Sequence, residues 1–377
     1  MPYKIWIILY ITLCFTACNT ASKVINFSER AAISGKVTHT GLIDCFAEGL
    51  SYDGGVPVYC EASAVVKTGE TLLIGIDKPV PGEQLSPVFT IPVDQLKEKQ
   101  IAQSKVNYIL AEPFREMQKI EAFTVTPDNR FFATTAFDRI RSKPDWDSYN
   151  SIATWTQDDF SDVAYVLPIE NEGVTSSKVL RSSIKNALKN EAFPDGPPYF
   201  KIEAMTALPG NRILFGVREL GESYEKFSYT FTLLEATYDM SSFGVAPAPE
   251  FRKIYAFQPE VNGRKLGISD MIYHAASNAL IALTSYEGSG DEKTKDMATY
   301  IWVLPMARLE RGEAPILVQD GNQPLEIAHK GEGLVMLDDN TLFIVHDEDR
   351  KESNVALAGG TVRKKPHQAV FSIVQLK

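Results

Sequence analysis

Histidine and cysteine are scarce in this chain, which contains five and four of them in 377 residues. The histidines are His39, His274, His329, His346 and His367. No HExxH or other short zinc spacing joins them. The sequence also has no G-x-S-x-G elbow, P-loop, dinucleotide-binding fingerprint or EF-hand loop. These absences exclude the enzymes and metal sites that depend on such motifs.

A long hydrophobic run is missing as well. The apolar stretch IWIILYITL after Lys4 is too short to span a bilayer, but it has the length of a signal-peptide core. It leads to Leu13-Cys14-Phe15-Thr16-Ala17-Cys18, where small residues stand before a cysteine. This resembles a bacterial lipobox, which implies cleavage before Cys18 and a lipid on that cysteine. Phe15 departs from the usual leucine, so an ordinary secretory cleavage near Ala17 stays open.

This export signal divides the chain into three parts. We expect a signal peptide over residues 1–17, a lipid-anchored tether over 18–30 and a single domain over 31–377. Asn19 rather than Asp follows Cys18, which in such lipoproteins implies delivery to the outer membrane, facing the periplasm or the cell surface. Several acyl chains would anchor the protein stably, because each buried methylene adds about 0.8 kcal/mol.

Positive charge is in deficit. The formal net charge is −10, and no dense basic patch with interleaved aromatic residues appears. Nucleic acid is therefore not expected as a partner. The hydrophobic content of 44% is nevertheless sufficient for a large core, so the chain should be globular.

The cysteines agree with export. Cys14 leaves with the signal and Cys18 would carry lipid, which leaves Cys45 and Cys60. In an oxidising periplasm these two should pair. A two-cysteine metal site is the competing interpretation, but no histidine or further cysteine lies nearby at a ligand spacing.

One sequence motif recurs along the chain with variations. Residues 200–221, FKIEAMTALPGNRILFGVRELG, have the pattern of a β-hairpin in which a Pro-Gly-Asn turn joins two apolar arms. Related phrases begin near residues 61, 121, 268 and 332, at spacings of about 60 to 80 residues, each with room for a second hairpin. The pattern predicts an all-β fold, a β-propeller of four-stranded blades.

The number of blades is expected to be five or six. The last repeat has one later strand before the chain ends, so an N-terminal strand over residues 31–38 is predicted to complete the final blade and close the ring. Residues 44–59 form either part of a sixth blade or an insertion held by a Cys45–Cys60 bridge.

One helix interrupts the repeats, at residues 178–190, and is predicted to pack on the rim of the second blade. Ser176 or Ser177 could cap its start. The apolar face of this helix consists of Val179, Leu180, Ile184 and Leu188.

The hairpin phrases resemble those of a known family. Residues 202–205 (IEAM) and 212–218 (RILFGVR), preceded by a helix, resemble a phrase of uncharacterised bacterial propeller proteins. Those proteins are similar to the esterase-like phytase propellers, whose own phrase is matched by residues 332–334 (EGL) and 342–347 (LFIVHD). The resemblance implies a propeller and makes a phytase-like activity one expectation, without assigning any catalytic residue.

An acidic residue opens the first strand of each repeat. These acids are Glu61, Glu121, Glu203, Asp270 and Glu332. Because the first strand of a blade is innermost, we expect them to converge near the mouth of the central channel, where they could supply the oxygen ligands that Ca²⁺ requires. Such an ion could polarise a phosphate or an ester. A second layer is expected from the acids that close the second strands, Asp77, Asp138, Glu219, Glu287 and Asp347.

A structural role for these acids competes with metal binding and is favoured. An acid repeated in every blade can accept backbone N–H bonds from the next blade or pair with nearby Lys and Arg residues. The repeat is broken at Ser269-Asp270, where the acid comes one position late. His346 is the best histidine for a general base or a ligand, although we expect it to lie exposed in a loop.

Two functions follow. The favoured hypothesis is a lipid-anchored envelope propeller that acts as a binding module for a protein, a glycan or a small ligand. The alternative is a calcium-dependent phosphoesterase or esterase with its site at the acidic channel mouth.

Overall fold

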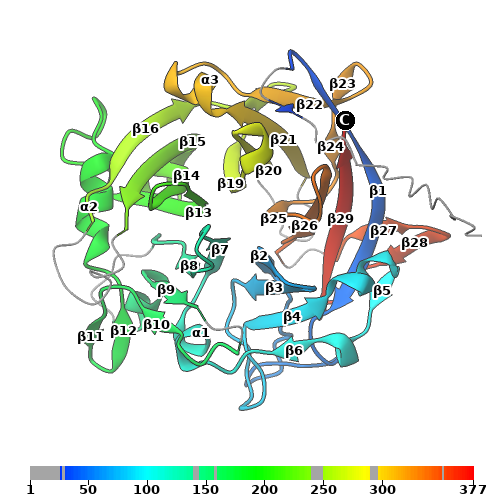
Figure 1. Ribbon diagram of the computed structural model, residues 1–377. Helices are drawn as coiled ribbons and strands as arrows, with labels where there is room; N and C mark the ends of the chain where they lie inside the picture. The colour runs from blue at the N-terminus through cyan, green and yellow to red at the C-terminus, as the bar shows by residue number, and fades with distance from the viewer. Residues whose placement is uncertain are drawn as a thin grey trace, which may run out of the picture.

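Five four-stranded antiparallel blades surround a common axis (Figure 1). The computed structural model describes residues 26–27, 30–138, 144–156, 159–238, 249–288, 296–349 and 352–377. The all-β propeller expected from the repeats is confirmed, with five blades in this part of the chain. Residues 45–60 form a connection between blades and contribute the isolated bridge Ser51–Pro57, so they are the insertion.

The first strand of each blade is the innermost, and the others follow outward. Blade 1 contains β2 (Ala62–Thr68), β3 (Thr71–Ile76), β4 (Val88–Pro92) and β6 (Asn107–Tyr108). Blade 2 contains β7 (Ile120–Val125), β8 (Phe131–Thr135), β9 (Ile152–Trp155) and β10 (Ala164–Tyr165). Blade 3 contains β13 (Tyr199–Leu208), β14 (Arg212–Ser223), β15 (Lys226–Thr237) and β16 (Arg252–Phe257). Blade 4 contains β19 (Gly267–His274), β20 (Ala279–Glu287), β21 (Met297–Pro305) and β22 (Ile316–Asp320). Blade 5 contains β25 (Gly331–Met336), β26 (Thr341–His346), β29 (Gln368–Leu376) and β1 (Ile33–Asp44).

The ring is closed by the two ends of the chain. The N-terminal strand β1 pairs antiparallel with the C-terminal strand β29, from Gly35 opposite Leu376 to Asp44 opposite Gln368. The predicted closing strand is thus confirmed, and it extends further than residues 31–38. β1 also pairs in parallel with β22, which joins blades 4 and 5 into one continuous sheet.

The hydrophobic core is divided among the gaps between blades. Trp155 packs edge-on against Phe114 at 5.1 Å between blades 1 and 2, and Phe343 stacks on Phe371 at 5.5 Å in the cluster between blades 5 and 1. The innermost strand of blade 3, β13, is covered on both faces by the neighbouring blades, and all of its residues are buried. Each blade is therefore held by its two neighbours, as in other repeat proteins.

Few helices accompany the sheets. The rim helix is confirmed as α2 (Leu180–Ala187), and Leu180 and Ile184 are buried against blades 2 and 3. The predicted serine cap is wrong, because Val179 occupies the N-cap and Ser177 hydrogen bonds to Ile152 instead. The other helical segments are α1 (Glu112–Glu116), α3 (Met306–Glu310), η2 (Val93–Lys97), η3 (Gln103–Lys105), η4 (Pro144–Tyr149) and η5 (Ala275–Ser277). None of the helices in the described residues has the length and apolarity needed to cross a bilayer.

The two ends of the ring carry different connections. On one end, the turn face, short turns join the first and second strands, at residues 69–70, 126–130, 209–211, 275–278 and 337–340. On the opposite end, the mouth face, the inner strands begin and the second strands end. The longer connections on the mouth face include the small hairpins β11 (Ile169–Asn171) with β12 (Val174–Ser176), β17 (Glu260–Val261) with β18 (Arg264–Lys265), and β27 (Asn354–Leu357) with β28 (Gly360–Arg363). The short strands β5 (Gln100–Ile101), β23 (Gln323–Pro324) and β24 (Glu326–Ile327) pair with β1, β22 and β21.

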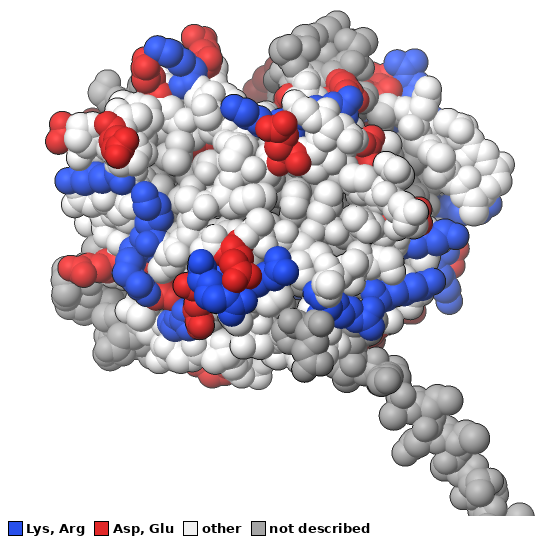
Figure 2. All heavy atoms as spheres, turned by 90° about the horizontal axis from the view of Figure 1, so that it is seen from above, with Lys and Arg blue, Asp and Glu red and all other residues white. Residues whose placement is uncertain are grey.

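Charged side chains are interspersed on the outer wall. Figure 2 views the ring from the side and shows acidic and basic groups next to one another on that face, without one large basic patch. The strongest concentration of buried charge lies instead along the channel wall, near the mouth face.

Candidate metal centre at the channel mouth

A β-bulge occurs at the same place on the inner strand of every blade. The register of each inner pair shifts by one residue, which leaves the bulged residue outside the ladder. The bulged residue is Glu121, Glu203 or Glu332 in blades 2, 3 and 5, and Ser63 or Ser269 in blades 1 and 4.

The five strand-opening acids are therefore all buried but not equivalent. Their exposed fractions are 1 or 2%. Asp270 follows its bulge by one residue, and Glu61 precedes its bulge by two. The sequence pattern aligns Glu61 with Glu121 because both begin a Glu-Ala phrase, whereas the strand register aligns Glu121 with Ser63.

Glu61 differs from the other four acids in its place on the strand, because it lies two residues before the bulge. Blades 2, 3 and 5 have a lysine there, namely Lys119, Lys201 and Lys330. Blade 4 has Gly267, and blade 1 has Glu61. A Lys-x-Glu triplet is thus repeated in three blades and is visible in the sequence, although its meaning depends on the register.

Each of these lysines connects its own blade to the preceding one. Lys119 Nζ lies 3.4 Å from Glu121 Oε1 and 3.9 Å from Asp77 Oδ2 of blade 1. Lys201 forms an ion pair with Glu203 in its own blade and lies 3.4 Å from Glu121 Oε1 of blade 2. These buried pairs fit the structural role favoured from the sequence, because an ammonium group neutralises carboxylates from two adjacent blades.

Lys330 makes the same connection between blades 5 and 4. Its Nζ lies 2.9 Å from Glu332 Oε1 and 3.4 Å from Glu287 Oε2. It also lies 3.7 Å from Asp347 Oδ2 and 3.6 Å from Asp349 Oδ1. One buried ammonium group is thus shared among four carboxylates.

An arginine replaces the lysine between blades 3 and 4. The Arg218 guanidinium is 1% exposed, and its Nη1 donates to Ser269 Oγ and Ser285 Oγ at 2.8 Å each. The same nitrogen lies 3.2 Å from Glu203 Oε2. Gly267 leaves room for this side chain, since a Cβ at that position would lie 2.6 Å from Arg218 Cγ.

Asp270 is held by backbone donors rather than by a cation. Its Oδ1 accepts from Met271 N at 2.8 Å, and its Oδ2 accepts from Leu334 N of blade 5 at 2.7 Å. This contact between blades is the structural role that the sequence suggested for a repeated acid.

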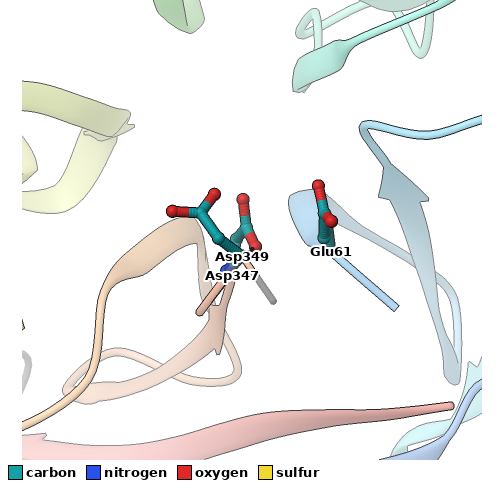
Figure 3. Close-up of side chains that lie close together, drawn as sticks. All are labelled: Glu61, Asp347 and Asp349. Carbon is teal, nitrogen blue, oxygen red and sulfur yellow. Dashed lines mark hydrogen bonds between the residues drawn. The ribbon is translucent and has the colours of Figure 1, made fainter. Parts of the chain in front are cut away.

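The junction between blades 5 and 1 reverses this charge pattern. Here Glu61 stands in the lysine position, and its carboxylate meets Asp347 and Asp349, which follow β26. One oxygen atom from each of the three lies within 4.8 Å of the others. Figure 3 shows Glu61 on one blade and the two aspartates on the other, with their carboxylates around one common space. We call these three residues the acidic triad.

Three lysines lie near the triad. Lys78 Nζ lies 2.6 Å from Glu61 Oε2 and 2.9 Å from Asp77 Oδ1. Lys330 is shared among Glu287, Glu332 and the two aspartates. Lys364 is 1% exposed, and its charge interacts with Glu61, Asp347 and Asp349. The carboxylates Glu61, Asp77, Glu287, Glu332, Asp347 and Asp349 still outnumber these three ammonium groups, so a further cation can be accommodated.

The proton affinities report this imbalance. Burial, reinforced by the charge of Asp77, raises the pKa of Glu61 to about 8. Burial likewise raises the pKa of Asp347 well above its usual range. Burial opposes ionisation of Asp77 too, but the Lys78 and Lys119 charges lower its pKa to about 2. A buried acid that holds a proton because burial and a neighbouring carboxylate outweigh its lysine partner can exchange that proton for a metal ion.

The donor set of the triad suits a hard cation. Ca²⁺ takes six to eight oxygen ligands, and three carboxylates supply three to six of them. Asp349 has a side chain that is 23% exposed, so the triad is open to solvent on its side. Of the five acids proposed as metal ligands from the sequence, Glu61 alone joins a group of this geometry among the described residues.

The sequence-based expectation for His346 is wrong. The residue is fully buried, its Nε2 lies 2.9 Å from Ser372 Oγ, and burial lowers its pKa to about 3. His329, whose Nδ1 lies 2.5 Å from Glu348 Oε1, packs 5.3 Å from it. His346 is the last residue of β26, so its side chain belongs to the core between strands rather than to a loop.

A disulfide lies beside the triad. Cys45 follows β1 of blade 5, Cys60 precedes Glu61, and the two are bonded with their Cα atoms 6.2 Å apart. The bridge therefore links blades 5 and 1 covalently at the junction where the three acids meet. Cys18, the predicted lipidation site, lies outside the described residues.

Comparisons with known proteins report on the fold. No protein-family model matches the chain, and no curated protein matches it. An α-L-arabinofuranosidase from Fusarium graminearum in complex with an iminosugar inhibitor is 9% identical, with a TM-score of 0.42 over 90% of this chain and 98% of that one. A GH43 endo-arabinanase from Bacillus licheniformis is 8% identical, with a TM-score of 0.38 over 85% of this chain and 93% of that one. The β-propeller domain of Myceliophteria thermophila Cps50 is 11% identical, with a TM-score of 0.32 over 82% of each chain. Likenesses at this level carry no argument about ligand or reaction.

Proposed function

We propose that this protein is a lipid-anchored β-propeller of the bacterial outer membrane that acts as a binding module. A protein, a glycan or a small ligand would bind at the mouth face, and a Ca²⁺ ion held by Glu61, Asp347 and Asp349 would form part of the binding site. Oxygen atoms of the bound molecule would complete the coordination of the ion. The lipid would be attached to Cys18.

One observation carries the proposal. At the junctions of blades 1 with 2, 2 with 3, 3 with 4 and 4 with 5, a lysine or arginine side chain connects the two blades. At the junction of blades 5 and 1 an acid takes the lysine position and meets two more acids. A packing role predicts the same arrangement in every blade, so this break favours an external cation.

A thermal-shift titration tests the ion. The purified domain is melted with chelator and with increasing Ca²⁺ at constant ionic strength. We expect stabilisation that follows mass action, about 2.7 kcal/mol when the free ion exceeds its Kd a hundredfold. An unchanged melting temperature across millimolar Ca²⁺ would refute the metal site.

A hydrolase is the second candidate, and the acidic triad favours it. A Ca²⁺ ion held by these carboxylates could polarise the phosphoryl or carbonyl oxygen of a substrate. Such an enzyme would hydrolyse phosphomonoesters, phytate or carboxylic esters in a Ca²⁺-dependent reaction that is lost in Glu61→Gln. If the metal-loaded protein turns over none of these substrates, the binding module is retained.

A further inference from the structure

The N-terminal end of the described domain is fixed on the turn face. Phe27 N donates to Ser277 Oγ at 3.1 Å, and the fully buried Phe27 ring lies 5.4 Å from the ring of His274. Ser277 belongs to the turn between β19 and β20, the inner pair of blade 4, and His274 is the last residue of β19. The chain therefore enters the propeller near its axis, at the end away from the acidic triad.

The start of β1 lies on the same face. Ser34 N donates to Lys377 O, and Leu376 N donates to Asn340 O in the turn between β25 and β26. From there β1 runs for 12 residues to Asp44 at the mouth face. A whole strand length thus separates the entry of the chain from the triad.

The tether between Cys18 and Asn26 is too short to bring Cys18 to the mouth face. Seven residues lie between Cys18 and Asn26, so the chain makes eight steps of about 3.3–3.6 Å and reaches at most about 29 Å. A path to the mouth face would cross a blade, about 14 Å for three strand spacings, and then follow a strand of 12 residues for about 40 Å. The required path of about 54 Å is nearly twice the reach of the tether.

We infer that a lipid on Cys18 holds the turn face toward the membrane and leaves the mouth face open to the aqueous compartment. This inference rests on the lipid anchor of the proposed function and deepens it. The partner of the mouth is then a soluble molecule or a polymer that approaches from the aqueous side, and not a lipid headgroup of the anchoring leaflet.

Energy transfer to the membrane measures the orientation. A fluorophore is attached through p-azidophenylalanine at Glu70, in the turn between β2 and β3, or at Tyr224, at the tip of the β14–β15 hairpin on the mouth face. Both residues are exposed. The lipidated chain is placed in vesicles of phosphatidylethanolamine and phosphatidylglycerol that contain a headgroup-labelled acceptor. We expect stronger transfer from position 70, which should lie closer to the bilayer by about 40 Å, the length of the 12-residue strand β14.

A second arm separates the orientation from the anchor. A chain that begins at Cys18 is coupled through the Cys18 thiol to a maleimide lipid, which gives the same tether whether or not cells acylate the protein. Equal or stronger transfer from position 224 in this arm overturns the inferred orientation. Absence of acyl chains on the protein isolated from membranes, by mass spectrometry, overturns the anchor alone. Transfer from position 70 that exceeds transfer from 224 in both arms supports the orientation.

Discussion

The junction of blades 2 and 3 and the junction of blades 5 and 1 occupy equivalent places in the ring but have residues of opposite charge at the same position, Lys201 in the first and Glu61 in the second. In the first, Lys201 lies between Glu121 and Glu203. In the second, Glu61 faces Asp347 and Asp349. Glu61 and Lys201, which occupy the same position in the two junctions, are both buried, so the difference between them is not one of solvent exposure. The lysine joins the blades at the first junction, whereas at the second an acid takes its place, and Lys78, Lys330 and Lys364 together with the proposed ion supply the positive charge.

The second junction is also the one at which the ring closes. Blade 5 contains both ends of the chain, and the Cys45–Cys60 bridge links it to blade 1. A covalent bridge therefore accompanies the acid cluster where the lysine is lacking. The contrast between the two junctions predicts four effects of decreasing size.

Removal of the shared ammonium group at the first junction should have the largest effect. Lys201→Met would leave Glu121 and Glu203 buried without the charge between them, and breaking a buried pair in this way costs about 3–5 kcal/mol. Urea denaturation at pH 7 measures the loss. Lys265→Met at an exposed position is the control and should change stability by less than about 0.5 kcal/mol. A loss below about 1 kcal/mol for Lys201→Met would mean that the pair does not join the blades.

Loss of the disulfide should weaken the closing junction by a comparable amount. The bridge closes a loop with a sequence separation of 15, for which chain entropy gives about 3 kcal/mol. The Cys45→Ser/Cys60→Ser double variant and the reduced wild type should show equal urea midpoints. Reductant should not shift the midpoint of the double variant. A wild-type midpoint that is insensitive to reductant would argue against a stabilising bridge.

Glu61→Gln should abolish the response to calcium. The amide cannot supply the charge that the ion requires, so the stabilisation of about 2.7 kcal/mol expected at a hundredfold excess over Kd should disappear. Glu121→Gln is the matched variant, since it removes a buried acid of the same channel wall at a junction that has its own lysine. It should melt at a lower temperature but keep the calcium shift. Loss of the shift in both variants would contradict a site confined to the closing junction.

The pH dependence of calcium binding is the smallest of the four effects when it is counted per pH unit. The folded pKa of Glu61, about 8, exceeds its unfolded value near 4.5, so the stability it contributes is full below pH 4.5 and is lost as the pH rises through 8. Calcium has to displace that proton, so its affinity should rise about tenfold per pH unit from pH 6 to 8, or about 1.4 kcal/mol per unit, and then level off. Calorimetry in buffers of different ionisation enthalpy counts the released protons. An affinity independent of pH would exclude Glu61 as a ligand.

Much of the fold could be predicted from the sequence because it depends on local patterns. The hairpin phrase at residues 200–221 and its relatives indicated the blades, and the unpaired final repeat indicated that an N-terminal strand would close the ring. The position of α2 followed from its apolar spacing. The cap of α2 did not, because Ser177 hydrogen bonds with Ile152 in a neighbouring strand.

The candidate site could be predicted only in part. The sequence indicated that Glu61 and Asp347 belong to the acids near the mouth, but it could not show that Glu61 occupies the lysine position, because a shift of two residues becomes visible only in the strand register. The fully buried state of His346 also depends on tertiary packing, because its sequence neighbours Asp347, Glu348 and Asp349 suggest solvent.

The pairing of β1 with β29 sets the order in which the molecule can mature. Residues such as Gly35 and Leu376 are neighbours in space but lie almost a full chain length apart. Blades 1 to 3 contain only strands that are contiguous in sequence, so they can form while the chain is still emerging, whereas β1 has no partner strand β29 until the last residues arrive. Closure of the ring by β1 and β29 then becomes a final step of folding, completed only when the C-terminal strand is available.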